Sequence, residues 1–212
     1  MRKIAAAVTI LFLPCIIFLT TFWWYALNIS YIQKEIERLN IYDEFKNDRQ
    51  QVDIKTIEVV SYLKDQKSIL DPQYFSERER LHMSDVKKLM QKARLLTISL
   101  IILALLSITY LALKERPLLG KSLFYGACLT FLLLFVLMAI AKLAFSGMFI
   151  NFHEAAFTND YWQLDPAKDT MVRIFNEQFF IDFLKNLVYK SLALATITLA
   201  IVITIRKKLN TV

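Results

Sequence analysis

Four long apolar blocks constrain this chain more than any other feature of its sequence. Residues 4–26, 95–113 and 122–141 contain no charged side chain, and residues 187–205 contain only Lys190. A helix that crosses a bilayer needs about 20 apolar residues, because each residue adds ~1.5 Å across a core of ~30 Å. A chain of 212 residues is too short to bury four such helices in a soluble core. We therefore predict an all-α membrane protein with four transmembrane helices.

The first block is expected to remain in the membrane as an anchor. Its 23 apolar residues exceed the roughly 7–15 of a cleavable signal peptide. It ends in four aromatic residues, 22–25, instead of a small-residue cleavage site. Such a cluster is typical of the membrane–water interface.

Basic residues gather in three short segments beside these blocks. They are Arg2, Lys3, Lys114, Arg116, Lys121, Arg206, Lys207 and Lys208, with Glu115 as the one acidic residue among them. Short segments rich in Lys and Arg stay in the cytoplasm, and these three share a side only if there are four spans. We therefore predict cytoplasmic termini, a cytoplasmic loop at 114–121, a cytoplasmic tail at 206–212, and transmembrane helices within residues 1–27, 95–113, 122–145 and 187–205.

The two remaining long segments, residues 28–94 and 146–186, should lie together on the outer side. The first has 13 basic and 12 acidic residues and the second has 3 and 6, so the net charge of +7 comes mainly from the cytoplasmic segments. This balance excludes a basic surface for nucleic acid. Apolar residues recur at helical spacing in both segments. We predict that they form a mostly helical extracytoplasmic cap.

Three cap helices can be placed approximately. The pattern over residues 32–39 predicts that the first span continues outward as an amphipathic helix. Residues 54–63 predict a second helix, with Ile54 and Ile57 on its apolar face. Ser84 is a candidate N-cap for a helix that enters the second span.

The chain has two histidines, and the topology brings one from each outer segment to the outer face of the membrane. His82 precedes the second span, and His153 follows the third. Histidine exchanges protons most readily near neutral pH. The residues alone leave two interpretations open: two histidines that only pack or face solvent, or a pair that performs acid–base chemistry.

Aromatic residues are concentrated around the second histidine. Between residues 145 and 183, 10 of 39 positions are aromatic, against 13% for the whole chain. An interfacial belt needs only a residue or two at each helix end. An aromatic pocket at the membrane surface, suited to a lipid-bearing substrate, is the competing explanation.

Other kinds of active site find little support. His153 and Glu154 begin an H-E-x-x-H pattern, but Phe157 replaces the second histidine of a zinc site. There is no G-x-S-x-G motif, and Cys15 and Cys128 both lie in apolar blocks. No acidic residue lies in a span, which excludes an intramembrane aspartate dyad. We expect neither a metal ion nor another cofactor.

Four stretches of the sequence resemble motifs of one family, the bacterial lipoprotein intramolecular transacylases (Lit). They are residues 75–86 (FSERERLHMSDV), 152–157 (FHEAAF), 159–166 (NDYWQLDP) and 175–180 (FNEQFF). The four spans, the outer cap and the total length also agree, so the resemblance covers essentially the whole chain. Asn176 stands where proline is expected, and Ala155-Ala156 replaces a bulkier apolar stretch. Neither departure involves a histidine.

The resemblance implies a specific reaction in the bacterial cytoplasmic membrane. The substrate would be a diacylglyceryl-modified lipoprotein in the outer leaflet. The enzyme would move the acyl chain from the sn-2 oxygen of the glyceryl group to the amino group of the N-terminal cysteine, giving the lyso form. In this family the two cap histidines are catalytic, which carries over to His82 and His153. We expect a monomer surrounded by membrane lipid, with no nucleic-acid partner.

This chemistry is compatible with the residues found. An amine attacks an ester, so no protein nucleophile is required. The α-amino group has a pKa near ~8 and must lose a proton before it attacks. We expect His153 to act as general base and His82 as acid or electrostatic partner, although the reverse order is open. The candidate substrate-binding residues are Phe152, Phe157, Trp162, Asn151, Arg78, Asp85 and Asp165.

Two other functions are compatible with the residues alone. A membrane sensor or adaptor could use the cap only to bind a partner protein, and it would keep its function without the histidines. Another lipid-directed acyltransferase or hydrolase could use the same pocket, but it would transfer to an external acceptor or release free fatty acid.

Overall fold

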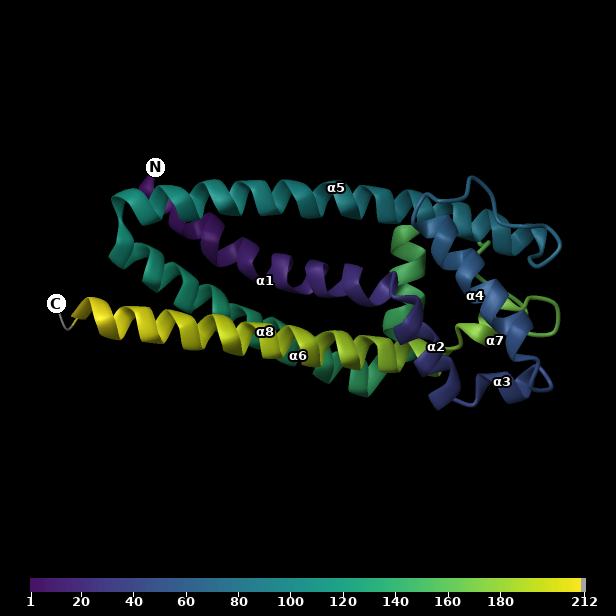
Figure 1. Cartoon of the computed structure of the whole chain (residues 1–212). Coiled ribbons are helices and arrows are strands. Elements are labelled where there is room, and N and C mark those ends of the chain that lie inside the picture. Colours follow the sequence, from purple (N-terminus) through teal and green to yellow (C-terminus); the bar gives the residue numbers. More distant parts are fainter. Residues whose placement is uncertain (211–212) are drawn as a thin grey trace. The chain divides into compact units, whose positions relative to one another are not determined.

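The computed structural model describes residues 1–210, with side chains described as far as Thr204. The described residues form helices joined by turns and loops, without a strand (Figure 1). These are α1 (Arg2–Ala26), α2 (Ile29–Arg38), α3 (Ile41–Glu44), α4 (Arg49–Leu63), α5 (Glu77–Lys114), α6 (Arg116–Ala156), α7 (Met171–Ile174) and α8 (Glu177–Asn210). The predicted all-α class is confirmed. Of the predicted tail 206–212, residues 211–212 lie outside the described residues.

The chain divides into two compact units. We call the first the membrane unit; it comprises Met1–Phe22, Arg94–Lys142 and Lys185–Val212. We call the second the cap; it comprises Trp23–Ala93 and Leu143–Leu184. α1, α5, α6 and α8 each contribute residues to both units.

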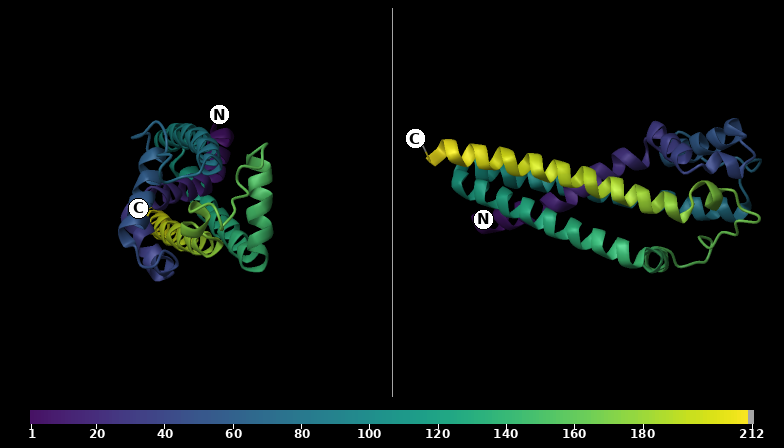
Figure 2. Two further views of the ribbon diagram at one scale, coloured as in Figure 1. Left: turned by 90° about the vertical axis from the view of Figure 1, so that its right-hand side faces the viewer. Right: turned by 90° about the horizontal axis from the view of Figure 1, so that it is seen from below.

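Four helical segments run alongside one another in the membrane unit, as the views of Figure 2 show. The start of α1, the connection between α5 and α6, and the last turn of α8 lie at the same end of this unit. α1, α5, α6 and α8 are each long and apolar enough to cross a membrane. Large apolar side chains such as Leu105 and Phe135, 58% and 75% exposed, point away from the unit. Lipid would cover them, because it is as apolar as they are.

Several hydroxyl groups in the membrane unit bond within their own helix. The hydroxyls of Thr9, Thr21 and Thr130 each donate to the carbonyl oxygen four residues earlier in the same helix, at 2.7–2.9 Å. α1 and α6 also approach closely at Gly126. A Cβ atom placed there would lie 3.0 Å from Leu13 Cδ2, so a small residue allows this contact.

The cap has a core to which both of its chain segments contribute. One cluster joins Ile36 of α2 and Val52 of α4 to Ile174 of α7. A second cluster joins residues of α4 and α5 to Met171 of α7. Segments more than 100 residues apart in the sequence therefore fold as one body.

Two helix boundaries in the cap differ from the predictions: α5 begins earlier than expected, and the first span does not continue outward without a break. α5 begins at Glu77, so the prediction of a start near Ser84 is wrong. Ser76 caps it: Ser76 Oγ accepts from the Glu79 N–H at 3.2 Å, and Glu79 Oε2 accepts from the Ser76 N–H at 2.6 Å. This reciprocal pair is a capping box. α1 ends at Ala26, and the amphipathic helix after it is separate, with Asn28 Oδ1 accepting from the Tyr31 N–H at 3.0 Å.

α4 exposes its expected apolar face in part. Ile54 and Ile57 are 37% and 43% exposed, while Lys55 and Glu58 on the same helix are buried. The Glu58 carboxylate pairs with Lys67 and accepts from the Asp71 N–H. These partners allow a charged side chain to be buried at a position that periodicity assigns to solvent.

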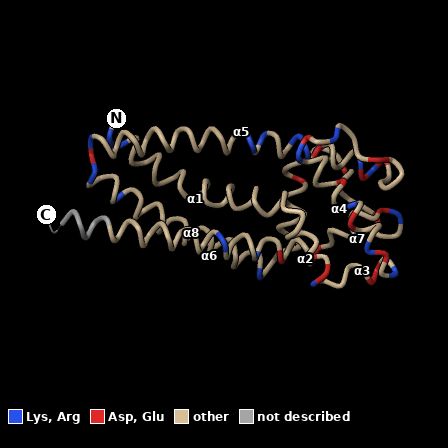
Figure 3. Tube along the Cα trace, in the orientation of Figure 1, with Lys and Arg blue, Asp and Glu red and all other residues tan. Residues whose placement is uncertain are grey.

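Charged residues follow the division between the units. Figure 3 shows long stretches without charge along the helices of the membrane unit, and charges in the α5–α6 connection and throughout the cap. Arg2 at the start of α1 lies 3.5 Å from Glu115 in that connection.

Candidate active site

The cap brings the two histidines together. His82 lies near the start of α5, and His153 lies near the end of α6, after a kink at Ala144 (φ −152°, ψ 43°). Their ring centroids are 6.1 Å apart, and the ring planes are inclined at 37°. Residues 71 positions apart in the sequence thus form one pair, as the predicted topology required.

Aromatic rings surround this pair. Phe149, Trp162, Phe152 and Phe157 lie 4.2, 5.0, 5.4 and 5.7 Å from the His153 ring, centroid to centroid. Phe157 also meets His82 edge to face at 5.4 Å. His153 is only 8% exposed as a result. The predicted aromatic surroundings of the histidines are therefore present.

One hydrogen bond assigns the proton of His153. Its Nδ1 lies 2.7 Å from the carbonyl oxygen of Phe149. A carbonyl oxygen can only accept, so the neutral ring carries its proton on Nδ1 and donates from there. The lone pair on Nε2 then remains available to accept a proton from a substrate.

Both histidines are held in their neutral forms, and both lie outside the apolar blocks. Burial, together with the neighbouring His153, lowers the pKa of His82 to about 4, and the Asp85 carboxylate opposes this shift. Burial also lowers the pKa of His153, against the opposing effect of the Phe149 carbonyl. At neutral pH the site therefore contains two uncharged imidazoles.

Asp85 lies about one turn after His82 on α5 and bridges the two cap segments. Its Oδ2 accepts from Asn159 Nδ2 at 2.9 Å, and its Oδ1 lies 3.1 Å from Lys88 Nζ. The hydrogen bond from Asn159 is the main reason why the pKa of Asp85 lies below its usual value. Asn159 was not singled out from the sequence, although it belongs to one of the four resembling motifs.

The other predicted site residues make their hydrogen bonds away from the histidine rings. Arg78 bonds the Asp160 carbonyl oxygen and lies 3.2 Å from the Asp160 carboxylate. Asp165 stabilises its own loop, because its carboxylate accepts from the Ala167 N–H at 2.9 Å. Asn151 is exposed. Among the described residues, neither Asp165 nor Asn151 forms a hydrogen bond or ion pair with a histidine.

Sequence reasoning also missed Glu79, which is 1% exposed. Glu79 Oε1 accepts from the Met171 N–H at 2.6 Å, while its Oε2 holds Ser76. Ser76 Oγ in turn donates to Asp169 Oδ1 at 2.7 Å. This network fixes the turn of α5 before His82 to the second cap segment. The S-x-x-E spacing of Ser76 and Glu79 was the local signal that could have revealed it.

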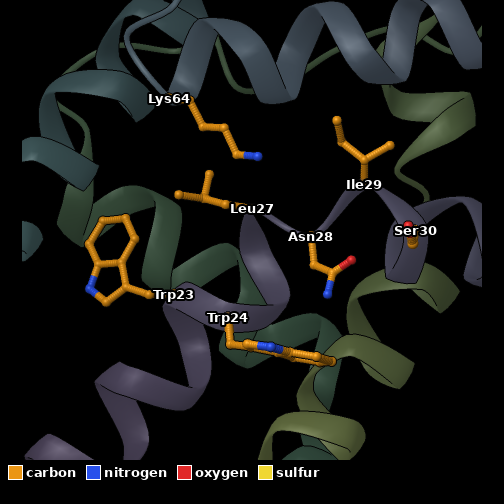
Figure 4. A pocket seen from close by; sticks show the side chains of 7 residues that line it. All are labelled: Trp23, Trp24, Leu27, Asn28, Ile29, Ser30 and Lys64. Carbon is orange, nitrogen blue, oxygen red and sulfur yellow. The ribbon is translucent and has the colours of Figure 1, made fainter.

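A separate hollow of about 360 Å³ in the cap contains none of the predicted site residues (Figure 4). It is lined by Trp23, Trp24, Leu27, Asn28, Ile29, Ser30 and Lys64. Over the described residues, no group of three or more His, Cys, Asp or Glu side chains could hold a metal ion.

The fold and this site define a class: a multi-pass membrane protein with a pair of neutral histidines, one of them buried, in an aromatic setting. The family model of the lipoprotein intramolecular transacylase Lit matches residues 6–180. The chain therefore belongs to the Lit family.

Solved structures agree with this assignment of the fold. The in meso structure of the membrane integral lipoprotein intramolecular transacylase Lit from Bacillus cereus is similar, with a TM-score of 0.91 and 24% identity, covering 100% of this chain and 99% of that one. Two variants of the Bacillus cereus protein, with one histidine replaced by arginine or by alanine, each have a TM-score of 0.86 and 23% identity. They cover 100% of this chain and 94% and 96% of theirs. A comparison with curated proteins gave no match.

Family membership confirms the predicted function. The protein is an acyltransferase that moves an acyl chain within a lipoprotein, from the sn-2 oxygen of its diacylglyceryl group to its own terminal amino group. It is a multi-pass membrane protein, and its substrate is a lipoprotein.

Proposed function

We propose that His153 is the general base of this reaction and that His82 stabilises the developing oxyanion as a neutral hydrogen-bond donor. The bond between His153 Nδ1 and the Phe149 carbonyl carries the first assignment, because it leaves Nε2 as the basic nitrogen. The depressed pKa of His82 supports the second. A ring that stays neutral keeps one N–H to donate and is a poor source of a full proton.

The proposed steps balance as follows. The amino nitrogen of the cysteine attacks the sn-2 ester carbonyl carbon, and His153 Nε2 accepts the proton that the nitrogen loses. A tetrahedral intermediate forms, and its oxyanion accepts a hydrogen bond from His82. The bond between the carbonyl carbon and the glyceryl oxygen then breaks, and protonated His153 returns the proton to that oxygen. An amide and a free glyceryl hydroxyl result, without a protein-bound intermediate, a metal ion or another cofactor.

The surrounding side chains would position the substrate. Phe152, Phe157 and Trp162 contact His153, and they suit the acyl chain and keep water from the ester. Holding amine and ester in attack geometry can contribute on the order of 7–11 kcal/mol in favourable cases. The negative charge of Asp85 acts on His82 and opposes the lowering of its pKa. The hydrogen bond from Asn159 holds this carboxylate in place.

The proposal also includes the orientation in the membrane. We place both termini in the cytoplasm and the cap at the outer face of the bacterial cytoplasmic membrane, with the segments 28–94 and 146–186 outside. The basic residues at the termini and in the loop 114–121 support this orientation. The protein would act as a monomer among membrane lipids, without nucleic acid.

Mass spectrometry of a reporter lipoprotein tests the proposal. The N-terminal peptide is isolated from cells that express the wild type, His82→Ala, His153→Ala, or the control Gln66→Ala, which changes an exposed residue. The wild type and the control should give a peptide of unchanged total mass, with one acyl group on the cysteine nitrogen and one on the glyceryl group.

Each histidine variant should leave both acyl groups on the glyceryl oxygens. Transfer that persists at the wild-type rate in both variants would refute the histidine roles. An unmodified diacyl N-terminus with inserted wild-type protein would refute transfer by this chain.

A further inference from the structure

A groove of about 650 Å³ lies on the cap beside the histidine pair. Its lining comes from the first turns of α5 and from residues 161–169, and it includes Arg78, Leu81, Tyr161, Gln163 and Lys168. The volume falls within the range of ligand sites in proteins. The reaction steps proposed above do not use this groove.

The groove and the histidine site share the same two backbone segments. On α5, Arg78 precedes His82 by four residues, so both side chains lie on one side of the helix. In the second segment, Tyr161 and Gln163 line the groove, while Trp162 between them lies 5.0 Å from the His153 ring. Neighbouring residues of the same two segments therefore serve the groove and the reaction site.

The chemistry of the two sites differs in a way that matches the two parts of the substrate. The histidines are surrounded by aromatic rings, which suit an acyl chain. The groove presents a guanidinium, a phenol, an amide and an ammonium group. A peptide carries an N–H and a C=O at every residue, and these groups need polar partners when they leave water.

We propose that this groove binds the polypeptide of the lipoprotein substrate immediately after its N-terminal cysteine. The inference rests on the proposed function: the reacting amine and the ester both belong to this cysteine, so the next residues must leave the site within a few ångströms. The groove begins one helical turn from His82.

The lining also indicates what kind of peptide is accepted. Its charges are mixed, with Arg78 and Lys168 opposed by Glu77, Asp165 and Asp169. Arg78 and Lys168 lie 3.2 Å and 3.7 Å from Asp160 and Asp165, respectively. Such a surface favours the backbone of an extended peptide over any one side-chain charge, so substrates of different sequence should bind comparably.

The test compares two substrates on the purified full-length protein in nanodiscs. One is a diacylglyceryl cysteine amide, and the other is the same group followed by five uncharged residues. We expect the wild type to show a KM about tenfold lower for the longer substrate. Tyr161→Phe and Gln163→Ala should each raise this KM roughly three- to tenfold, the equivalent of one hydrogen bond. Neither variant should change kcat or the KM for the cysteine amide.

Gln66→Ala provides a matched control, because Gln66 is an exposed glutamine outside the groove. Thermal unfolding verifies that the variants fold. Equal wild-type KM values for both substrates, or equal effects of the groove variants on both, would overturn the groove assignment while the transfer reaction stands. Transfer by His153→Ala within tenfold of the wild-type rate would instead overturn the proposed function.

Discussion

In the membrane unit, the hydroxyl of Thr130 donates to Gly126, four residues earlier in its own helix. In the cap, the hydroxyl of Ser76 donates to Asp169, and the carboxylate of Glu79 accepts from Met171, across separations of 93 and 92 residues. A helix in lipid must satisfy its polar groups locally, because no water is available to do so. The cap satisfies them by joining distant segments.

This difference determines what a single substitution can disturb. Replacing a threonine in the membrane unit removes a hydroxyl together with its bond and leaves the helical carbonyl bonded within the backbone. Replacing a buried carboxylate in the cap leaves donors on another segment without a partner, which costs much more. Catalytic geometry should therefore depend on the cap much more sensitively than on the polar residues of the spans.

Substitutions in the cap and in the membrane unit should differ most in their effect on activity. His153→Ala should lower turnover by roughly 10²- to 10⁴-fold, the contribution of a positioned acid–base group. Thr130→Val in the membrane unit should retain activity within about twofold. Both are measured as transfer in nanodiscs. If His153→Ala kept its turnover within tenfold of the wild type, activity would not distinguish the cap from the membrane unit.

The next largest difference between substitutions in the two units should be in the free energy of unfolding. Glu79→Ala leaves the Met171 and Ser76 N–H groups without their acceptor and should lower the free energy of unfolding by about 3 kcal/mol. Thr130→Val should lower it by less than about 0.5 kcal/mol. Glu79→Gln keeps one acceptor oxygen and should fall between the two. Denaturant unfolding in one detergent compares them, and equal losses for Glu79→Ala and Thr130→Val would contradict the comparison.

The pH dependence of stability should originate in the cap. The pKa of His82 is about 4 in the folded protein and ~6.5 in an unfolded chain. Between these values the unfolded state binds the proton first, so stability falls as the pH drops from about 6.5 towards 4, by at most about 1.4 kcal/mol per pH unit. The lowered pKa of His153 acts in the same direction.

Unfolding midpoints at pH 7.5 and pH 5 test this origin in the wild type and in His82→Gln. The variant should lose less stability on acidification. If both proteins lost the same stability on acidification, a group other than His82 would be responsible for the pH dependence.

Two glycines, one in each unit, offer a matched comparison with the smallest expected effects on stability. At Gly126 a Cβ atom would meet Leu13 at 3.0 Å and the Ile10 Cα at 3.4 Å, whereas at Gly147 in the cap nothing lies within 4 Å. Gly126→Ala should therefore destabilise the protein by about 1 kcal/mol. Gly147→Ala should stabilise it by roughly 0.5–1 kcal/mol through helix propensity. Thermal unfolding measures both, and the same sign for the two would show that the close contact at Gly126 is not limiting.

The sequence predicted most of the features that depend on the average composition of long segments. Four apolar blocks define four helices, because span length follows from bilayer thickness. The meeting of His82 and His153 followed from topology and from the family motifs. The charged residues Glu58 and Glu79 were missed as buried groups, because their burial depends on partners that periodicity does not reveal. For the same reason the partial exposure of Ile54 and Ile57 was not predicted.

The alternation at residues 161–163 has a consequence for how the chain can change during evolution. Trp162 contacts His153, while its two neighbours face the groove. Inserting or deleting one residue there would move Trp162 away from His153 and its two neighbours away from the groove, so both sites would be disturbed in a single event. The exposed stretch 65–69 does not join two sites in this way, although Lys67 within it pairs with Glu58. Length variation among descendants of this protein should therefore accumulate there and be absent at 161–163.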